Sequence, residues 1–303
     1  MGVGTLCSQR RASSVLSLSK LQRRIMRLCF RLFALTAFFL PIAAAAANTP
    51  LRLYVLDCGT LAVADLAAID PVAGKGKSKT LADACYLVVH PKGTLVWDTG
   101  LGDELAAKPE GVQAAPGFHM SMKKSVAAQF KEIGVAPDSV RYLGLSHMHG
   151  DHIGNVSLFP HSTLLMQKEE YAAAFGPRAA SFGNDPSAYP TLARNPVTKL
   201  NGDHDVFGDG SVLIKRAPGH TPGHQVLFLQ LPNTGKVLLS GDMTVYESHW
   251  HSRTVPTFNF DKPASRRTMA HMARFLKANQ AKLWIQHDFE QNATLRRAPA
   301  YYD

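Results

Sequence analysis

The sequence reads Ser-His-Met-His-Gly-Asp-His-Ile-Gly-Asn at residues 146–155. Within this stretch, four side chains that can bind a metal ion lie close together: His147, His149, Asp151 and His152. Imidazole nitrogens and a carboxylate oxygen, with no thiolate among them, suit zinc or another borderline divalent cation. A helix would scatter these side chains around its axis, whereas a loop that leaves a strand lets them converge. The alternative, a histidine-rich surface loop, is disfavoured by further candidate ligands downstream.

Three later segments also place a histidine or an aspartate where an apolar run stops and a turn begins. His220 lies in Ala-Pro-Gly-His-Thr-Pro-Gly-His, Asp242 in Ser-Gly-Asp-Met, and His287 in Ile-Gln-His-Asp. Loops carried on a rigid scaffold are the usual place for such ligands. We therefore expect these segments to lie at the ends of strands.

The pattern of apolar residues predicts alternating strands and helices. Residues 84–90 and 94–97 form a predicted hairpin, and residues 122–133 a predicted helix that ends at Gly134. Strand runs followed by a helix occur twice, which indicates two β-rich layers flanked by helices. Residues 176–201 are rich in Pro, Ser, Gly and Asn, so we expect a surface excursion that covers the site.

The composition fits one large domain, or two small ones, with an apolar core: 303 residues, 46% of them hydrophobic. The net charge of +10 suggests nucleic-acid binding, but seven of the basic residues lie in residues 1–47, which contain no acidic residue. Subtracting these seven leaves +3 on the remaining residues. We therefore expect no nucleic-acid partner for the mature domain.

Residues 1–47 have the layout of a secretory signal peptide. A basic segment precedes the apolar run Leu32–Ile42, and Ala43–Ala47 supplies small residues for cleavage. The apolar run is short for a membrane span, so we expect no stable membrane insertion after cleavage. The prediction is a periplasmic or secreted domain over residues 48–303. An uncleaved membrane anchor is the alternative, and initiation at Met26 would still leave a charged start.

Two of the four cysteines, Cys7 and Cys29, lie in the predicted signal peptide. The other two, Cys58 and Cys85, remain in the mature domain. Export would permit a disulfide between them, but two buried thiols on neighbouring strands would fit the sequence equally well.

Together, the four histidine and aspartate segments resemble the metallo-β-lactamase superfamily, from residue 51 to the C-terminus. The resemblance implies an α/β fold, a single-domain αββα sandwich with a binuclear site for two divalent metal ions, for which we expect zinc. It implies two groups of ligands joined by a bridging aspartate: His147, His149 and His220 for one ion, Asp151, His152 and His287 for the other, and Asp242 as the bridge. It also implies that Asp98 orients ligand histidines and that His224 packs rather than binds.

This ligand count leaves room for a water between the two ions. Two cations lower the pKa of such a water from about 15.7 toward about 7, which makes hydroxide available as a nucleophile. Asp151 is expected to orient that hydroxide or to pass a proton to the leaving group. No serine or cysteine nucleophile is then needed, and the sequence contains no Gly-x-Ser-x-Gly motif.

Within the superfamily, the chain is most similar to the N-acyl homoserine lactone lactonases. The similarity rests on Gln-His-Asp-Phe-Glu-Gln at residues 286–291, on residues 217–225, and on the strand pair and Asp-Thr-Gly-Leu within residues 86–101. It implies quorum quenching by opening the lactone ring. Tyr246 matches a tyrosine that donates a hydrogen bond to the lactone carbonyl. However, it follows Asp242 by four residues where the family has three, and an exposed loop tyrosine is the alternative.

Gly150 occupies a position where family members often carry a larger residue beside the acyl group, so we expect a wider pocket that tolerates long acyl chains. His249-Trp250-His251 is expected to be a mobile aromatic rim near the mouth rather than a further metal pair.

Other reactions of the same core remain open: hydrolysis of an ester, a thioester, a β-lactam or a phosphotriester. A non-catalytic exported metal-binding protein is the alternative of a different class. Loss of a ligand would mark it, and all seven expected ligands are present. The expected partner is a small-molecule substrate, and the chain is compatible with a homodimer.

Overall fold

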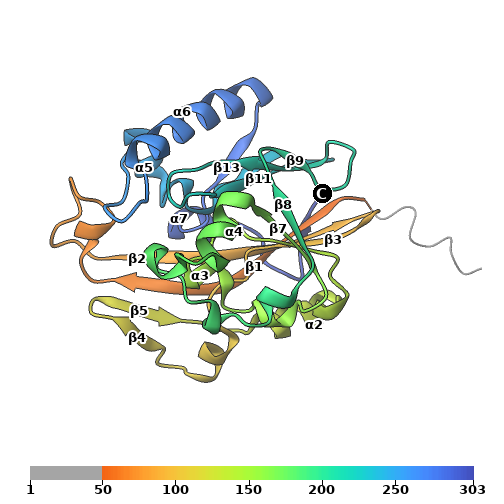
Figure 1. Cartoon of the computed structure of the whole chain (residues 1–303), viewed down its shortest axis with the longest axis horizontal. Helices are drawn as coiled ribbons and strands as arrows, with labels where there is room; N and C mark the ends of the chain where they lie inside the picture. The colour runs from red at the N-terminus through yellow and green to blue at the C-terminus, as the bar shows by residue number, and fades with distance from the viewer. Residues whose placement is uncertain (1–49) are drawn as a thin grey trace, which may run out of the picture. The chain divides into compact units, whose positions relative to one another are not determined.

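The structure is a computed structural model that describes residues 50–303 (Figure 1). The predicted signal peptide, with Cys7 and Cys29, lies outside the described residues. Among the described residues, no helix has the length and apolar character needed to cross a membrane.

A mixed sheet of nine strands forms the first layer of the described chain. Its order is β4-β5-β1-β2-β3-β6-β7-β8, with β14 also paired to β1. Strands β1 to β3 pair antiparallel, and β3, β6, β7 and β8 pair parallel. The strands are β1 Arg52–Val63, β2 Lys79–His90, β3 Gly93–Trp97, β4 Val112–Ala115, β5 Phe118–Ser121, β6 Tyr142–Gly144, β7 Thr163–Gln167, β8 Val197–Leu200 and β14 Tyr301–Tyr302.

A second sheet of five strands has the order β13-β12-β11-β10-β9. Its strands are β9 His204–Asp205, β10 Val212–Arg216, β11 Gln225–Leu231, β12 Gly235–Leu239 and β13 Lys282–Trp284. β12 and β13 are parallel, and the other neighbours are antiparallel.

The α-helices lie around these sheets, with α6 along the outside of the second one (Figure 1). Their bounds are α2 Val126–Ile133, α3 Gly150–Ile153, α4 Lys168–Phe175, α5 Glu247–Ser252, α6 Lys262–Asn279 and α7 Phe289–Ala293. α2 begins where the Ser125 side chain accepts from the Ala128 amide, and it ends at Gly134 in the left-handed conformation. The predicted start of this helix at residue 122 was too early, because the Ser125 cap begins the helix at Val126.

The main core lies between the two sheets. Strand β1 alternates, because Leu53 and Val55 join the core that contacts the second sheet while Tyr54 and Leu56 face the opposite side. Trp97 is fully buried in the inter-sheet core. α6 covers the outer face of the second sheet through Met269 and Met272. The expected α/β sandwich is therefore confirmed.

Residues 176–201 differ in part from the predicted surface excursion. Most of the segment consists of turns and short 3-10 helices, including Ala179–Phe182 and Leu192–Arg194. Its end, however, forms β8, which pairs with β7 and buries Leu200. The sequence pattern missed this strand because its two apolar residues, Val197 and Leu200, lie on opposite faces and do not alternate with polar ones.

Cys58 and Cys85 form a disulfide across β1 and β2, with their Cα atoms 5.9 Å apart. Both residues are fully buried. This geometry decides between the two alternatives that the sequence left open.

Replacing both cysteines, as Cys58→Ala/Cys85→Ala, should lower the free energy of unfolding by about 3 kcal/mol, because the crosslink closes a loop in the unfolded chain. Urea unfolding measures the loss. A reductant should destabilise the wild-type protein and leave the double variant unchanged. Equal stability of the two proteins without reductant would contradict the prediction.

Candidate metal centre

Seven side chains that can bind a metal come together at the ends of strands from both sheets. Within each of two groups, the candidate ligand atoms lie within 4.8 Å of one another: His147, His149, His220 and Asp242 in the first group, and Asp151, His152 and His287 in the second. The loop after β6 supplies His147 and His149, and the one-turn helix α3 that follows it supplies Asp151 and His152, where the sequence predicted a loop throughout. The β10–β11 loop, the turn after β12 and the turn after β13 supply the other three. These are the seven residues that the sequence singled out.

Asp242 lies between the two groups. Its Oδ2 atom is 3.2 Å from Nε2 of His220. Its Oδ1 atom is 3.2 Å from Nε2 of His152 and 3.0 Å from Nε2 of His287. The two oxygens of one carboxylate therefore face different groups of histidines, which is the arrangement needed to bridge two cations.

The hydrogen bonds behind the histidines leave their Nε2 atoms free for a metal. Nδ1 of His152 is 3.1 Å from Oδ2 of Asp98, Nδ1 of His220 is 3.0 Å from Oδ1 of Asn259, and Nδ1 of His287 is 2.7 Å from the Ala82 carbonyl. Because these oxygens accept, each Nδ1 carries a proton, and in the neutral imidazole Nε2 is then the atom whose lone pair can bind a metal.

These lone pairs converge on one another. His220 Nε2 is 3.2 Å from His147 Nε2 and 3.0 Å from His149 Nδ1. His152 Nε2 and Asp242 Oδ1 are buried without a hydrogen-bond partner among the described residues. Buried acceptors that face one another are unfavourable unless a cation lies between them. The donor set of nitrogens and carboxylate oxygens thus fits divalent metal ions.

The pKa values of the metal-free protein separate the two groups of histidines. Burial lowers the pKa of His220 to about 3. Burial also opposes the charge of His287, but the carboxylates of Asp242 and Asp151 outweigh it and raise the pKa of His287 to about 9. Burial alone would raise the pKa of Asp242, yet His287 and His152 hold it well below its ordinary value. Asp242 is therefore a carboxylate at neutral pH.

Asp98 orients the loop after β6, as the resemblance implied. Its Oδ1 atom accepts from the Ser146 amide at 2.6 Å, while Oδ2 faces His152. Asp98 is fully buried and has a φ of 55°, an uncommon conformation for a residue other than glycine. Such strain is often found where a side chain must be aimed at a functional site.

His224 packs behind Asp242 instead of joining the candidate ligands. Its Nδ1 donates to the Ala217 carbonyl at 3.0 Å, and its Nε2 accepts from the Asp242 amide at 2.9 Å. Both ring nitrogens are therefore used. Gly241 makes this contact possible, because a Cβ there would lie 2.7 Å from His224 Nε2.

Glu170, which sequence reasoning missed, joins two of the loops. Its Oε1 atom accepts from the Met148 amide at 3.1 Å. Its Oε2 atom accepts from the Thr221 hydroxyl at 2.7 Å and from the Gly223 amide at 2.9 Å. Burial raises its pKa, against the effect of these hydrogen bonds. Glu169 and Glu170 are neighbours at the start of α4, and nothing in the local sequence distinguishes the buried one from the other.

Tyr246 is buried, in contrast to the alternative of an exposed loop tyrosine. Its ring packs 3.8 Å from the ring of His249 and joins an apolar cluster with Leu66 and Ile69. Burial and the nearby Asp70 carboxylate raise its pKa to about 12. Its hydrogen bond to a lactone stays a prediction.

The expectation of a mobile rim at residues 249–251 was wrong for His249. That side chain is buried in α5, and its Nε2 lies 3.4 Å from Oδ2 of Asp70. The neighbouring Asp70 carboxylate holds the ring inside, which periodicity alone could not indicate.

A cavity of about 210 Å³ opens beside the first group of candidate ligands. His149 and His220 line it on one side. Three phenylalanines, which we call the aromatic rim, also line it: Phe182, Phe258 and Phe260. Phe258 and Phe260 are 52% and 59% exposed. Phe182 belongs to the segment 176–201, so part of the predicted excursion does reach the site.

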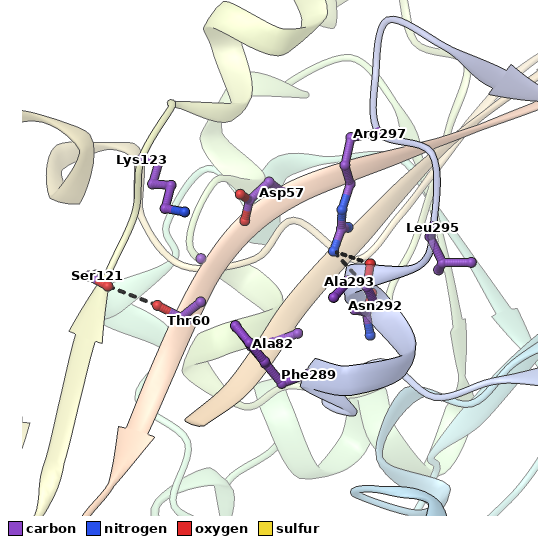
Figure 2. A pocket seen from close by; sticks show the side chains of 11 residues that line it. Asp57, Thr60, Ala82, Ser121, Lys123, Phe289, Asn292, Ala293, Leu295 and Arg297 are labelled. Atoms are coloured by element: carbon purple, nitrogen blue, oxygen red, sulfur yellow. Dashed lines mark hydrogen bonds between the residues drawn. The ribbon is translucent and has the colours of Figure 1, made fainter. Parts of the chain in front are cut away.

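A second cavity, of about 290 Å³, is lined by residues of β1, β2 and α7, among them Asp57, Ala82 and Asn292 (Figure 2). Ala82 lines this cavity and also accepts the hydrogen bond of His287 through its carbonyl. Asn292, which also lines the cavity, donates to the carbonyls of Ile285, Gln286 and Asp288. Asn292 therefore holds the turn that carries His287.

Comparison with known proteins places this site among characterised hydrolases. The family model of the Metallo-beta-lactamase superfamily matches residues 80–280. The N-acyl homoserine lactonase AttM of Azorhizobium caulinodans is 30% identical over 84% of this chain and 100% of its own length. The N-acyl homoserine lactonase AiiA of Bacillus thuringiensis subsp. kurstaki is 27% identical over 82% of this chain and 98% of its own.

A solved N-acyl homoserine lactone hydrolase, with the product N-hexanoyl-L-homoserine at its catalytic metal center, has a similar fold. Its TM-score is 0.72 at 25% identity, covering 84% of this chain and 100% of that one.

Glu170→Gln should lower the free energy of unfolding by about 2 kcal/mol, because a glutamine has one acceptor oxygen for donors that now use two. The bound metal should also be lost more readily to a chelator, since the two loops would separate. Urea unfolding and metal analysis after dialysis test both effects. Glu169→Gln is the matched control, and its loss should be at most about 1 kcal/mol. Equal behaviour of the two variants would refute this role of Glu170.

Proposed function

The chain belongs to the metallo-beta-lactamase superfamily of metal-dependent hydrolases, and we propose that it is an exported binuclear enzyme that opens N-acyl homoserine lactones. The observation that carries the proposal is the position of Asp242, with one oxygen toward each group of histidines.

We assign His147, His149 and His220 to one metal ion and Asp151, His152 and His287 to the other, with Asp242 shared between them. Zinc suits this set of nitrogen and oxygen donors best. When bound, two such ions lower the pKa of a water between them and polarise a substrate carbonyl.

The residues of the chain contribute orientation and proton transfer. Asp151 has a side chain that is 23% exposed, against 10% for Asp242, so it lies on the open side of the site. It lies 3.8 Å from Nε2 of His152 and of His287. From there Asp151 can orient the attacking water and carry a proton to the leaving alkoxide. Tyr246 is proposed as a donor to the lactone carbonyl by resemblance alone.

The aromatic rim supports a substrate with an apolar tail. Its side chains line the cavity beside His149 and His220, so an acyl chain could pack there while the ester lies at the metal centre. The lactonases among the relatives support the same substrate class.

Export is supported by two features. Residues 1–47 have the signal-peptide pattern, and the buried Cys58–Cys85 disulfide is typical of oxidising compartments. The address we propose is the periplasm or the exterior of the cell.

The direct experiment is a panel of substrates on zinc-loaded protein: short- and long-chain acyl homoserine lactones, a β-lactam, a glutathione thioester and paraoxon. The lactones should give the highest kcat/KM. A higher value for any other substrate would replace the lactone assignment, while inactivity on all of them would leave a metal-binding protein.

His147→Ala and Asp242→Ala should each strip metal and abolish turnover, because each removes a ligand from a shared centre. Metal content by elemental analysis and lactone hydrolysis measure the effects. His251→Ala, at an exposed histidine paired with Glu247, is the control and should keep both. Retention of metal and most activity by either ligand variant would overturn the assignment.

Gly150→Leu should lower kcat/KM for long acyl chains at least about tenfold relative to short ones, because we expect its side chain, next to His149 in the cavity wall, to narrow the space for the acyl chain. The backbone can accept the change, since Gly150 is exposed and an added Cβ would meet nothing within 4 Å. Gly150→Ala should give a smaller effect. A chain-length profile that stays the same in both variants would count against a role of Gly150 in the pocket.

A further inference from the structure

One face of α6 carries an unusual concentration of positive charge. Five basic side chains are exposed along it, and we call them the basic face: Lys262, Arg266, Arg267, Arg274 and Lys277. At about 100° per residue they fall within an arc of about 140°. The helix contains no acidic residue, and its opposite side buries Met269, Met272 and Leu276.

This arrangement opposes the stability of the helix itself. Lys262 and Arg266 are four residues apart, and Arg274 and Lys277 three apart, so like charges are neighbours. Lys262 also lies in the first turn, where the helix dipole disfavours a cation, whereas Lys277 lies in the last turn, where a cation is favoured. None of the ion pairs between residues 50 and 303 includes a member of the basic face. The charge of the basic face is therefore exposed to solvent and available to an anionic partner.

Exposed aromatic side chains adjoin this face. Phe260 precedes Lys262 by two residues, and the ring of Phe182 lies 5.8 Å from that of Phe260. The guanidinium of Arg178 lies 5.9 Å from the Phe182 ring, which extends the positive charge to the far side of the aromatic rim.

The segment between rim and helix is tied to the metal centre. The Phe260 amide donates to the His220 carbonyl at 3.0 Å, and the Asp261 amide donates to the Gly219 carbonyl at 2.9 Å. The basic face, the aromatic rim and the mouth of the 210 Å³ cavity therefore belong to one fixed region.

We propose that the basic face of α6 and the aromatic rim dock on the surface of an anionic phospholipid bilayer. Clustered Lys and Arg attract acidic headgroups, and half-exposed phenylalanines gain by entering the boundary with the acyl chains. A sulfated polysaccharide such as heparin would satisfy the charges but offers no apolar surface to the exposed rings. α6 lies on the outside of the second sheet, where such a surface can reach it (Figure 1).

Docking would place the mouth of the cavity at the boundary between bilayer and water, because the same rings line the cavity. The inference is independent of the reaction, since binding to vesicles requires no substrate.

Cosedimentation with vesicles tests the proposal. The protein should bind vesicles of equal parts phosphatidylcholine and phosphatidylglycerol, bind phosphatidylcholine alone far more weakly, and dissociate as salt is raised. All variants keep the same N-terminal residues, so that only the substitutions differ.

The triple variant Arg267→Gln/Arg274→Gln/Lys277→Gln should lower the partition coefficient on the order of a hundredfold, about fivefold for each cation. Lys75→Gln/Lys77→Gln/Lys108→Gln is the control, because it removes the same charge from exposed loop positions and should keep most of the binding. Phe258→Ser/Phe260→Ser should also weaken vesicle binding by tenfold or more.

Three results would overturn the proposal. One is equal binding to both kinds of vesicle, and another is an equal loss in the two triple variants. The third is tighter binding to a duplex DNA fragment or to heparin than to vesicles, with no effect of the phenylalanine substitutions. The melting temperatures of the glutamine variants should equal that of the wild-type protein. A loss of vesicle binding in these variants then does not result from unfolding.

Discussion

The carboxylate of Asp242 is the group on which the site depends. It lies within 3.2 Å of the Nε2 atoms of three histidines, and four separate loops must meet for these contacts to form. Burying one carboxylate among several imidazoles is unfavourable unless charges and lone pairs are matched. The sandwich meets this demand because strands of both sheets end at the same edge. A second group of side chains then holds each loop in place.

This second group consists of residues that are not candidate ligands themselves but hold the loops that carry the ligands. His224 holds the Asp242 amide, Asp98 holds the loop after β6, and Glu170 joins that loop to the one carrying His220. Each uses hydrogen bonds that water would otherwise compete for, so each is buried. Glycines belong to the same arrangement: a Cβ at Gly223 would lie 2.3 Å from the Glu170 amide nitrogen. The loops that carry the candidate ligands are thus held in place by their neighbours.

The surroundings of the site are asymmetric. Polar groups surround the candidate ligands, whereas the aromatic rim lines one side of the cavity and is joined through Asp261 to the start of α6, which carries the basic face. The proposed acyl tail of the substrate requires apolar contacts, which the aromatic rim offers. The proposed anionic bilayer requires positive charge, which the basic face offers. The domain as a whole carries little net charge, so the charge on α6 reflects its distribution and not the composition.

The sequence alone determined the chemistry: the seven candidate ligands, the αββα sandwich and the family could be predicted because metal-binding motifs are short and local. Tertiary structure decided what depends on residues distant in the chain. It paired Cys58 with Cys85, made Glu170 a buried connector and enclosed His249 against Asp70. It also turned the end of segment 176–201 into β8. None of these features has a local signal. A glutamate or a histidine has the same sequence context whether its hydrogen-bond partner is water or a residue of a distant loop. Only folding brings the partner within hydrogen-bonding distance.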